Sequence, residues 1–494
     1  MADADRRLYR FDPPDTSGIF LGLGPLQCAL FGAGLFAAVG ALSAGAPLAV
    51  AALPAAAGTA ASFARLRGEP AWRWLAVAAS WGLARLGRGR RWVAPVALLP
   101  DDAGRPTPLP PCLEGIELVE VPWRGRRRLG AVRDTRRHTL TAALRVTGPA
   151  FVVQPRGDQE RLLSGWGEVL SAFAVEGGAV THLAWSDLAA PSGLEAHRAW
   201  MAGVEGGQSC PQARASYDEL LAGATAMATA HDVVVTLTVS RERLSGRARD
   251  DGAGTRLAKA LASSTEALVR AGRAAGLEVG DPLGAAELRR ALRTRCDPAA
   301  ATPTGAGGRL VDRLGLVGAA SAGPVALESS WRHVRVDGAF HRTYEVAAWP
   351  RLAQAPGWLE PFLAGAGVIR TMTVVFRPVP AHQSRRRIER DLVKLDSDAA
   401  TKQDKGRRVD ARHRRATQAV LDREDELVAG YAEMSYAALV GVCASSLEEL
   451  DDHALVVEQA AREAGMELRC LDARQDLAWA AALPLGLAPR HLGL

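Results

Sequence analysis

The chain has 494 residues, of which 48% are hydrophobic and 23% are charged, and this composition excludes an intrinsically disordered protein. The length allows two or three domains. The net charge of +6 is modest, and one arginine-rich stretch between Arg124 and Arg145 accounts for the excess.

The first predicted element is a pair of membrane-spanning helices. Residues 16–64 contain no Asp, Glu, Lys or Arg, and one span needs about 20 apolar residues. Two spans fit, at 19–42 and at about 46–63. The side chains expected within the membrane are Ile19, Phe20, Leu26, Leu30, Phe31, Leu35, Leu48, Val50 and Leu53.

Arginines flank this apolar stretch on both sides, at Arg6, Arg7 and Arg10 before it and at Arg65, Arg67 and Arg73 after it. The positive-inside bias then places both ends in the cytoplasm. We therefore expect a multi-pass protein of the cell (inner) membrane, anchored by a two-helix hairpin, with the bulk of the chain cytoplasmic. A signal peptide and a buried soluble hairpin are the alternatives. A signal h-region is only about 7 to 15 residues long, so the apolar stretch is too long for a signal peptide. Pro47 and Pro54 weaken the second span.

Residues 67–112 are predicted to be an interfacial segment followed by a Pro-rich linker. Tryptophans alternate with arginines here, at Trp72, Trp74, Trp81 and Trp92, which is typical of a helix lying on a membrane surface. An amphipathic helix packed on the soluble domain fits the same pattern. The sequence PDDAGRPTPLPPC, at 100–112, marks the clearest boundary.

The remaining chain is predicted to be α+β, built from ferredoxin-like βαβ modules. Three short strand-like runs, GIELVEVPW, LGAVRD and TLTAALRVTG, are expected to form a β-meander within 115–148. The apolar run FVVQP, at 151–155, is expected to be a strand before a helix and the strand VTHLAWSD. Similar strand-helix-strand units recur near FHRTYEVAAWP and MSYAALVGVCA. The predicted domains are the hairpin 1–66, the segment 67–112, a module 113–330 and a second module 331–494.

A solvent-projecting helical pair is predicted within the second module, at 384–431. This stretch holds few large apolar residues between 396 and 416, and its 13 Lys and Arg are diluted by 10 Asp and Glu. We interpret the stretch IRTMTVVFRPVPAHQSRRRIERD, at 369–391, as a strand that leads into this pair. The pair is expected to dock a partner.

The arginine-rich stretch is the candidate surface for anionic ligands. Its candidate contact residues for anionic lipid or nucleic acid are Arg124, Arg126, Arg127, Arg128, Arg136 and Arg137. A membrane-tethered domain beside an anionic leaflet uses arginines in the same way. Lipid headgroups or a protein partner are therefore favoured over nucleic acid.

No catalytic or cofactor motif is present in the sequence. The Walker, G-x-G-x-x-G, G-x-S-x-G, HExxH and EF-hand patterns are all absent. The six cysteines form neither a CxxC pair nor a zinc-type cluster, which favours core residues in a reducing compartment over a disulfide framework. We expect no enzymatic activity, no metal and no cofactor.

Beyond the apolar hairpin, four stretches carry a family resemblance: GPAFVVQPRGDQERLLSGWGEVLSAFA, AGLEVGDPLGAAELRRALRTRCDP, IRTMTVVFRPVPAHQSRRRIERD and AREAGMELRCLDARQDLAWAAALPL. Together they resemble an actinobacterial integral membrane protein family over nearly the whole chain. That family looks like a PrgI/VirB3-type membrane hairpin fused to the ATPase-less N-terminal part of the VirB-type conjugation ATPase.

The resemblance implies a non-enzymatic scaffold of a type IV secretion-like or conjugation apparatus. Its expected partners are the membrane, a separately encoded VirB-type secretion ATPase and other secretion components, and a homo-oligomer is compatible with this role. No functional residue is carried over, because the family's catalytic residues lie in the missing motor domain. The alternatives are an EccE-like membrane component of type VII secretion and a membrane-tethered DNA-binding protein. An unrecognised enzyme is disfavoured because no catalytic motif is found.

Overall fold

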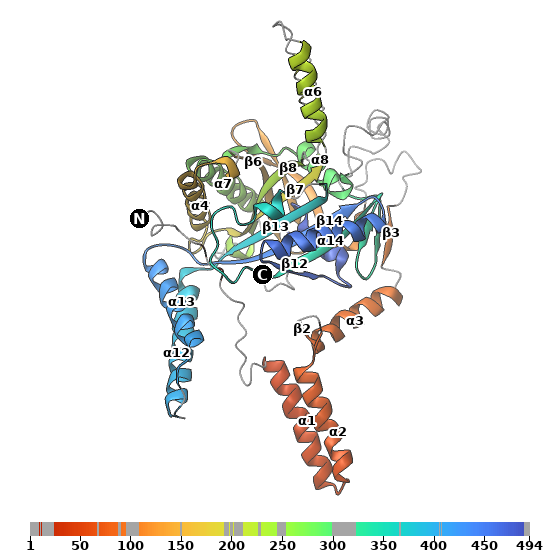
Figure 1. Cartoon of the computed structure of the whole chain (residues 1–494), viewed down its shortest axis with the longest axis vertical. Helices are drawn as coiled ribbons and strands as arrows, with labels where there is room; N and C mark the ends of the chain where they lie inside the picture. The colour runs from red at the N-terminus through yellow and green to blue at the C-terminus, as the bar shows by residue number, and fades with distance from the viewer. Residues whose placement is uncertain are drawn as a thin grey trace.

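The computed structural model describes residues 24–66, 69–86, 90–94, 108–148, 151–191, 211–225, 229–244, 253–298, 323–364, 367–404 and 408–488, together with Tyr9, Phe11, His197, Met201 and Gly406. Figure 1 shows a helical hairpin at one end, a body built on a β-sheet, and helices that project from the body. The predicted membrane residues Ile19 and Phe20, and positions 100–107 of the Pro-rich linker, lie outside the described residues.

The hairpin consists of α1 (Pro25–Ser43) and α2 (Leu48–Phe63). The turn between them uses Gly45 at a φ of +79°, a backbone conformation that glycine adopts without steric cost. Pro47 then precedes α2, where the missing N–H of proline costs nothing. A two-stranded ribbon, β1 (Arg65–Leu66) and β2 (Glu69–Pro70), leads into α3 (Ala71–Leu86).

The body is a 13-stranded sheet in which every described pairing is antiparallel. Its strands are β3 (Arg91–Val93), β4 (Ile116–Pro122), β5 (Arg128–Asp134), β6 (Thr139–Thr147), β7 (Val180–Pro191), β8 (Thr229–Ser240), β9 (Glu278–Pro282), β10 (Ala326–Ser329), β11 (Val334–Val336), β12 (Ala339–Ala348), β13 (Ile369–Pro378), β14 (Met434–Ala444) and β15 (Glu467–Cys470). The order is β3-β10-β11-β12-β14-β13-β7-β8-β6-β5-β4, with β15 beside β12 and β9 beside β6. The mixed α+β fold class is therefore confirmed.

The helices of the body are α4 (Arg156–Ser171), α6 (Pro211–Thr225), α7 (Ala253–Ala274), α8 (Ala285–Cys296), α11 (Glu360–Leu363), α12 (Ala381–Asp404), α13 (Ala411–Val428), α14 (Leu447–Glu463) and α15 (Gln475–Ala482). Short 3-10 turns are η2 (Pro111–Leu113), η3 (Phe151–Val153) and η4 (Glu242–Leu244).

Two consecutive parts of the chain follow the same course through the sheet. The first unit runs β6-α4-β7-β8-α7-β9, and its strands lie in the order β9-β6-β8-β7. The second unit runs β12-α11-β13-β14-α14-β15, in the matching order β15-β12-β14-β13. Each unit is preceded by two further strands and followed by one helix, α8 or α15. Each also has a helical insertion between its second and third strands: α6 in the first unit and α12–α13 in the second.

Helices cover both faces of the sheet. On the first face, α4 and α7 pack over the first unit, with Leu261 of α7 fully buried against Leu237 and Leu183, and α11 and α14 pack over the second unit. On the second face, α8 and α15 share one apolar cluster that includes Leu288 and Trp479. Alternate residues of each strand point to opposite faces, so the sheet is buried on both sides.

The two units meet where β7 pairs with β13, from Ala189 opposite Arg370 to Leu183 opposite Phe376. Trp185 of β7 packs against the apolar clusters of both units on the first face. The two units therefore share one continuous sheet.

The prediction of a strand at 151–155 is wrong, because Phe151–Val153 forms a 3-10 turn. The amide of Gln159 donates hydrogen bonds to the carbonyls of Phe151, Val152 and Gln154, and so fixes the turn. Val153 is 77% exposed and has no burial to gain from a strand.

Candidate membrane and docking surfaces

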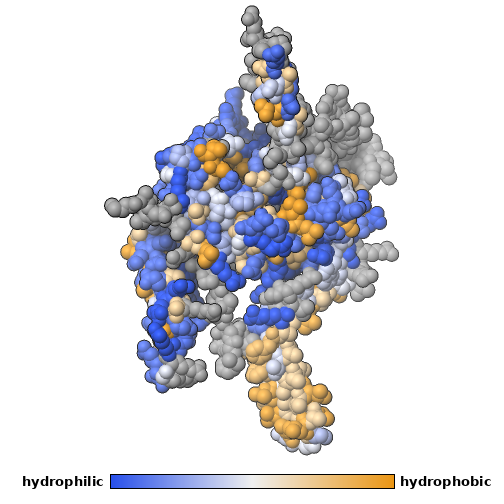
Figure 2. All heavy atoms as spheres, in the orientation of Figure 1, coloured by the Kyte–Doolittle hydropathy of each residue, from blue (hydrophilic) through white to orange (hydrophobic). Residues whose placement is uncertain are grey.

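The outer surface of the hairpin is apolar, although the rest of the described chain leaves most of it uncovered. Large hydrophobic side chains point outward from both helices: Leu26, Leu35, Phe36, Val39, Leu42, Leu48, Val50 and Leu53. Figure 2 shows this end as a continuous hydrophobic surface, in contrast to the mostly hydrophilic body. Exposed apolar surface of this kind is unfavourable in water and favourable in a bilayer.

One described helix, at Leu26–Ser43, is long and apolar enough to cross a membrane. The second apolar helix, Leu48–Phe63, is shorter. Of the predicted membrane residues, Leu26, Leu30, Phe31 and Leu35 lie on α1, whereas Leu48, Val50 and Leu53 lie on α2.

The inner seam of the hairpin is built from small and polar residues. Gly34 and Gly58 face each other so closely that a Cβ on Gly34 would lie 2.7 Å from the Cα of Gly58 and 2.7 Å from the carbonyl oxygen of Pro54. At the open end, the buried Gln27 amide donates to the Ser62 carbonyl at 2.7 Å, and the Ser62 hydroxyl donates to the Gln27 carbonyl at 2.9 Å. Small residues at a crossing and interhelical hydrogen bonds are the devices that hold helices together in a bilayer. Sequence reasoning missed this seam, since glycine is abundant throughout the chain.

The helix α3 links the hairpin to the sheet. The indole of Trp81 packs edge-on against Trp331, with 5.4 Å between ring centroids, and the Arg90 guanidinium lies 3.7 Å from the Trp81 centroid. Leu75 and Leu83 of α3 stay largely exposed. The predicted interfacial helix therefore also contacts the body, and its remaining apolar residues face outward.

The six arginines of the candidate anion surface do not form one patch. Arg124, Arg126, Arg127 and Arg128 lie at the β4–β5 turn, whereas Arg136 and Arg137 follow β5 at its other end. The strand between these two groups is about 20 Å long at ~3.3 Å per residue.

Carboxylates already pair with most of these arginines. The pairs are Arg124 with Glu266, Arg127 with Asp281, Arg128 with Glu120, Arg136 with Glu114, and Arg137 with Asp134. Arg126 is exposed and has no ion-pair partner among the described residues. The local positive field is thus weaker than the sequence indicates, and the assignment of these residues to lipid or nucleic acid stays a prediction.

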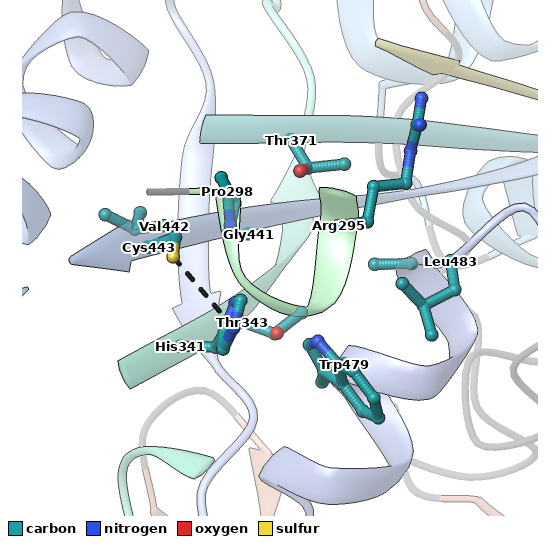
Figure 3. A pocket seen from close by; sticks show the side chains of 11 residues that line it. Arg295, Pro298, His341, Thr343, Thr371, Gly441, Val442, Cys443, Trp479 and Leu483 are labelled. Carbon is teal, nitrogen blue, oxygen red and sulfur yellow. Dashed lines mark hydrogen bonds between the residues drawn. The ribbon is translucent and has the colours of Figure 1, made fainter. Parts of the chain in front are cut away.

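A small cavity lies between the sheet and the helices α8 and α15 (Figure 3). His341, Thr343, Cys443, Arg295 and Trp479 are among the residues that line it. The buried imidazole of His341 donates its Nε2–H to the carbonyl of Cys296 at 2.9 Å. These contacts hold α8 onto the second face of the sheet.

No group of three His, Cys, Asp or Glu side chains within the described ranges could hold a metal ion. The expectation that the protein has no enzymatic activity rests on the sequence motifs and stays a prediction.

Two buried histidines make the body sensitive to acid. Burial lowers the pKa of His182 and of His341 to about 4, and each keeps a carbonyl partner, at Gly486 and Cys296. The unfolded chain takes up protons near pH 6.5. The free energy of unfolding is therefore highest above pH 6.5, and it decreases as the pH falls toward 4.

We expect each of these histidines to remove about 2 kcal/mol of stability between pH 7 and pH 5. The unfolding midpoint in urea, followed by tryptophan fluorescence at several pH values, measures this loss. The His341→Gln variant should show a shallower pH dependence, whereas His413→Gln, on the projecting helix α13, should keep the full one. Equal slopes for the two variants would contradict the assignment.

The described chain thus joins an α+β body to one N-terminal helix that is long and apolar enough to cross a membrane. The family model described as "Putative type VII ESX secretion system translocon, EccE" matches residues 225–346. The matched range runs from the last residue of α6 into β12, about a quarter of the chain. No curated protein matches the sequence.

This match supports the alternative of a type VII secretion membrane component over the type IV prediction. It gives no support to the resemblance to PrgI/VirB proteins or to a VirB-type ATPase as partner.

Proposed function

We propose that the protein is a non-enzymatic, membrane-anchored scaffold component of a type VII secretion system. The match of residues 225–346 to the EccE family model carries this proposal. The matched residues include α7 and α8, which cover opposite faces of the sheet, so the match lies in the structural core of the body.

The anchor of this scaffold is the α1–α2 hairpin, with both helices crossing the cell membrane and the body in the cytoplasm. At 1.5 Å per residue, the 19 residues of α1 extend about 28 Å and the 16 residues of α2 about 24 Å, against a hydrocarbon thickness of about 30 Å. Local thinning of the bilayer accommodates such a shortfall. The Gly34–Gly58 contact and the Gln27–Ser62 hydrogen bonds support a second helix that accompanies the first through the membrane.

The body consists, in this proposal, of two ferredoxin-like modules, at 113–330 and 331–494. In each unit the strands neighbour one another in the order fourth, first, third, second, which is the arrangement of a β-α-β-β-α-β module. The β7–β13 pairing joins the modules, and their helical insertions dock other secretion components.

Purification of the tagged full-length chain in mild detergent, followed by mass spectrometry, tests this function. We expect other membrane components of a type VII secretion system to copurify. An unrelated two-span membrane protein with the same tag is the control. Enrichment of a VirB-type ATPase, or recovery of the chain from the soluble fraction, would contradict the proposal.

A further inference from the structure

The charges of the projecting pair α12–α13 are separated along its length. Residues 402–415, which join the two helices and form the tip of the pair, hold seven Lys and Arg against two Asp. The rest of 384–431 holds six Lys and Arg against eight Asp and Glu. The mixed charge predicted for this stretch is therefore an average over a basic tip and an acidic remainder.

Three tip arginines, Arg408, Arg414 and Arg415, are exposed, and none has an ion-pair partner among the described residues. Asp410 accepts a hydrogen bond from the backbone N–H of His413 at 2.7 Å and so caps α13. Closer to the body, by contrast, Arg423 of α13 is paired with Asp391 of α12. The tip therefore carries unneutralised positive charge, whereas carboxylates pair with all of the β4–β5 arginines except Arg126.

The fold sets the direction in which this tip points. In Figure 1, α12–α13 projects from the body to the same side as the α1–α2 hairpin, while α6 projects to the opposite side. In this view the lower ends of α12 and α13 extend past the level at which the tilted hairpin opens, where α1 begins and α2 ends. With the hairpin inserted, this level is the headgroup region of the bilayer.

We propose that the tip of α12–α13 binds the anionic headgroups of the leaflet from which the hairpin enters the membrane. This inference rests on the proposed anchoring by α1–α2. Each basic residue near an anionic leaflet strengthens binding about fivefold. Because α3 connects the hairpin to the body, an inserted hairpin also keeps the tip close to the membrane surface. Weak contacts between the tip and the headgroups are then sufficient for binding.

The tip is less suited to nucleic acid than to a bilayer. Residues 402–415 contain no Phe, Tyr or Trp on which bases could stack. A tip held at the headgroup level also leaves no room for a duplex between itself and the membrane.

Hydrogen exchange of the full chain in lipid nanodiscs tests this contact. One disc preparation contains phosphatidylcholine alone, and the other contains phosphatidylcholine with phosphatidylglycerol. The variant Arg408→Glu/Arg414→Glu/Arg415→Glu reverses the tip charge. Glu near the first turn of α13 is favourable to the helix dipole, so the variant keeps its helices.

The matched control is Arg385→Glu/Arg386→Glu/Arg390→Glu, which makes the same charge change on exposed residues at the root of α12. We expect backbone amides in 402–415 to exchange at least fivefold more slowly in the anionic discs than in the neutral discs. The tip variant and 0.5 M salt should abolish this difference, and the root variant should keep it.

Amides of α1 report on the anchor in the same experiment. If α1 is protected in both discs and the tip exchanges equally fast in both, the leaflet contact is overturned while the anchoring stands. If α1 is unprotected, the anchoring is wrong and the leaflet contact falls with it. Protection of the tip by added duplex DNA in neutral discs, without protection by anionic discs, would also overturn the proposal.

Discussion

Replacing Gly34 by leucine should separate α1 from α2, whereas the same replacement at Gly40 should leave the hairpin intact. A Cβ at Gly34 meets only backbone atoms of α2, at 2.7 Å, and backbone cannot move aside as a flexible side chain can. A Cβ at Gly40 meets nothing within 4 Å. We expect a cost of about 3 kcal/mol for Gly34→Leu, at the upper end of overpacking penalties.

Cross-linking across the seam measures this separation. Phe31 and Phe63 have ring centroids 6.1 Å apart, so cysteines at these two positions should cross-link efficiently with a short bis-maleimide once Cys28 is replaced by Ala. Gly34→Leu should reduce the yield strongly in detergent and in bilayers. The yield with Gly40→Leu should match the parent chain, and an equal loss in both variants would show that the close crossing is not what holds the hairpin.

Replacing Arg295 by alanine should destabilise the body by about 2–3 kcal/mol, because Asp232 loses its buried charged hydrogen-bond partner and keeps only the more exposed Arg145. Arg295 is 3% exposed and donates to the Asp232 carboxylate at 2.7 Å and to the Asp232 carbonyl at 2.9 Å. Burial acts to raise the pKa of Asp232, but the guanidiniums of Arg295 and Arg145 together hold it below its ordinary value. The pair fixes α8 to β8.

The urea midpoint of unfolding, followed by tryptophan fluorescence, checks this expectation. Arg290→Ala on the same helix is the control, since Arg290 is exposed and has no ion-pair partner among the described residues, so its loss should cost about 0.5 kcal/mol or less. Arg295→Met combined with Asp232→Leu should recover most of the loss, because it removes both charges and keeps apolar volume. A double variant as unstable as Arg295→Ala would indicate that packing, not charge, dominates this site.

The sequence was sufficient to locate the apolar hairpin helices and most strands. A long stretch without charge needs no knowledge of the rest of the chain, and the alternation of Val233, Val235, Leu237 and Val239 predicts strand β8 from neighbouring residues alone. The strand prediction at 151–155 was wrong because the conformation of Phe151–Val153 depends on hydrogen bonds from the amide of Gln159. A hydrophobic pattern contains no information on these bonds.

Long-range pairings could not be predicted in this way. Alternation gives the period of β7 and β13 but not the fact that they pair with each other across the join between the units. The same limit applies to charge, because Glu266, which neutralises Arg124, lies 142 residues further along the chain. Arginine at position 295 gave no sign of burial, since arginines in this chain are mostly exposed.

The pairing of β7 with β13 also has a mechanical consequence. One sheet runs unbroken from β3 to β4, with helices on both faces, so backbone hydrogen bonds connect the two halves of the body. The insertions α6 and α12–α13 arise at equivalent points of the two units and extend to opposite sides (Figure 1). The β7–β13 hydrogen bonds therefore lie between the two halves of the body, and a force between these halves should act on them.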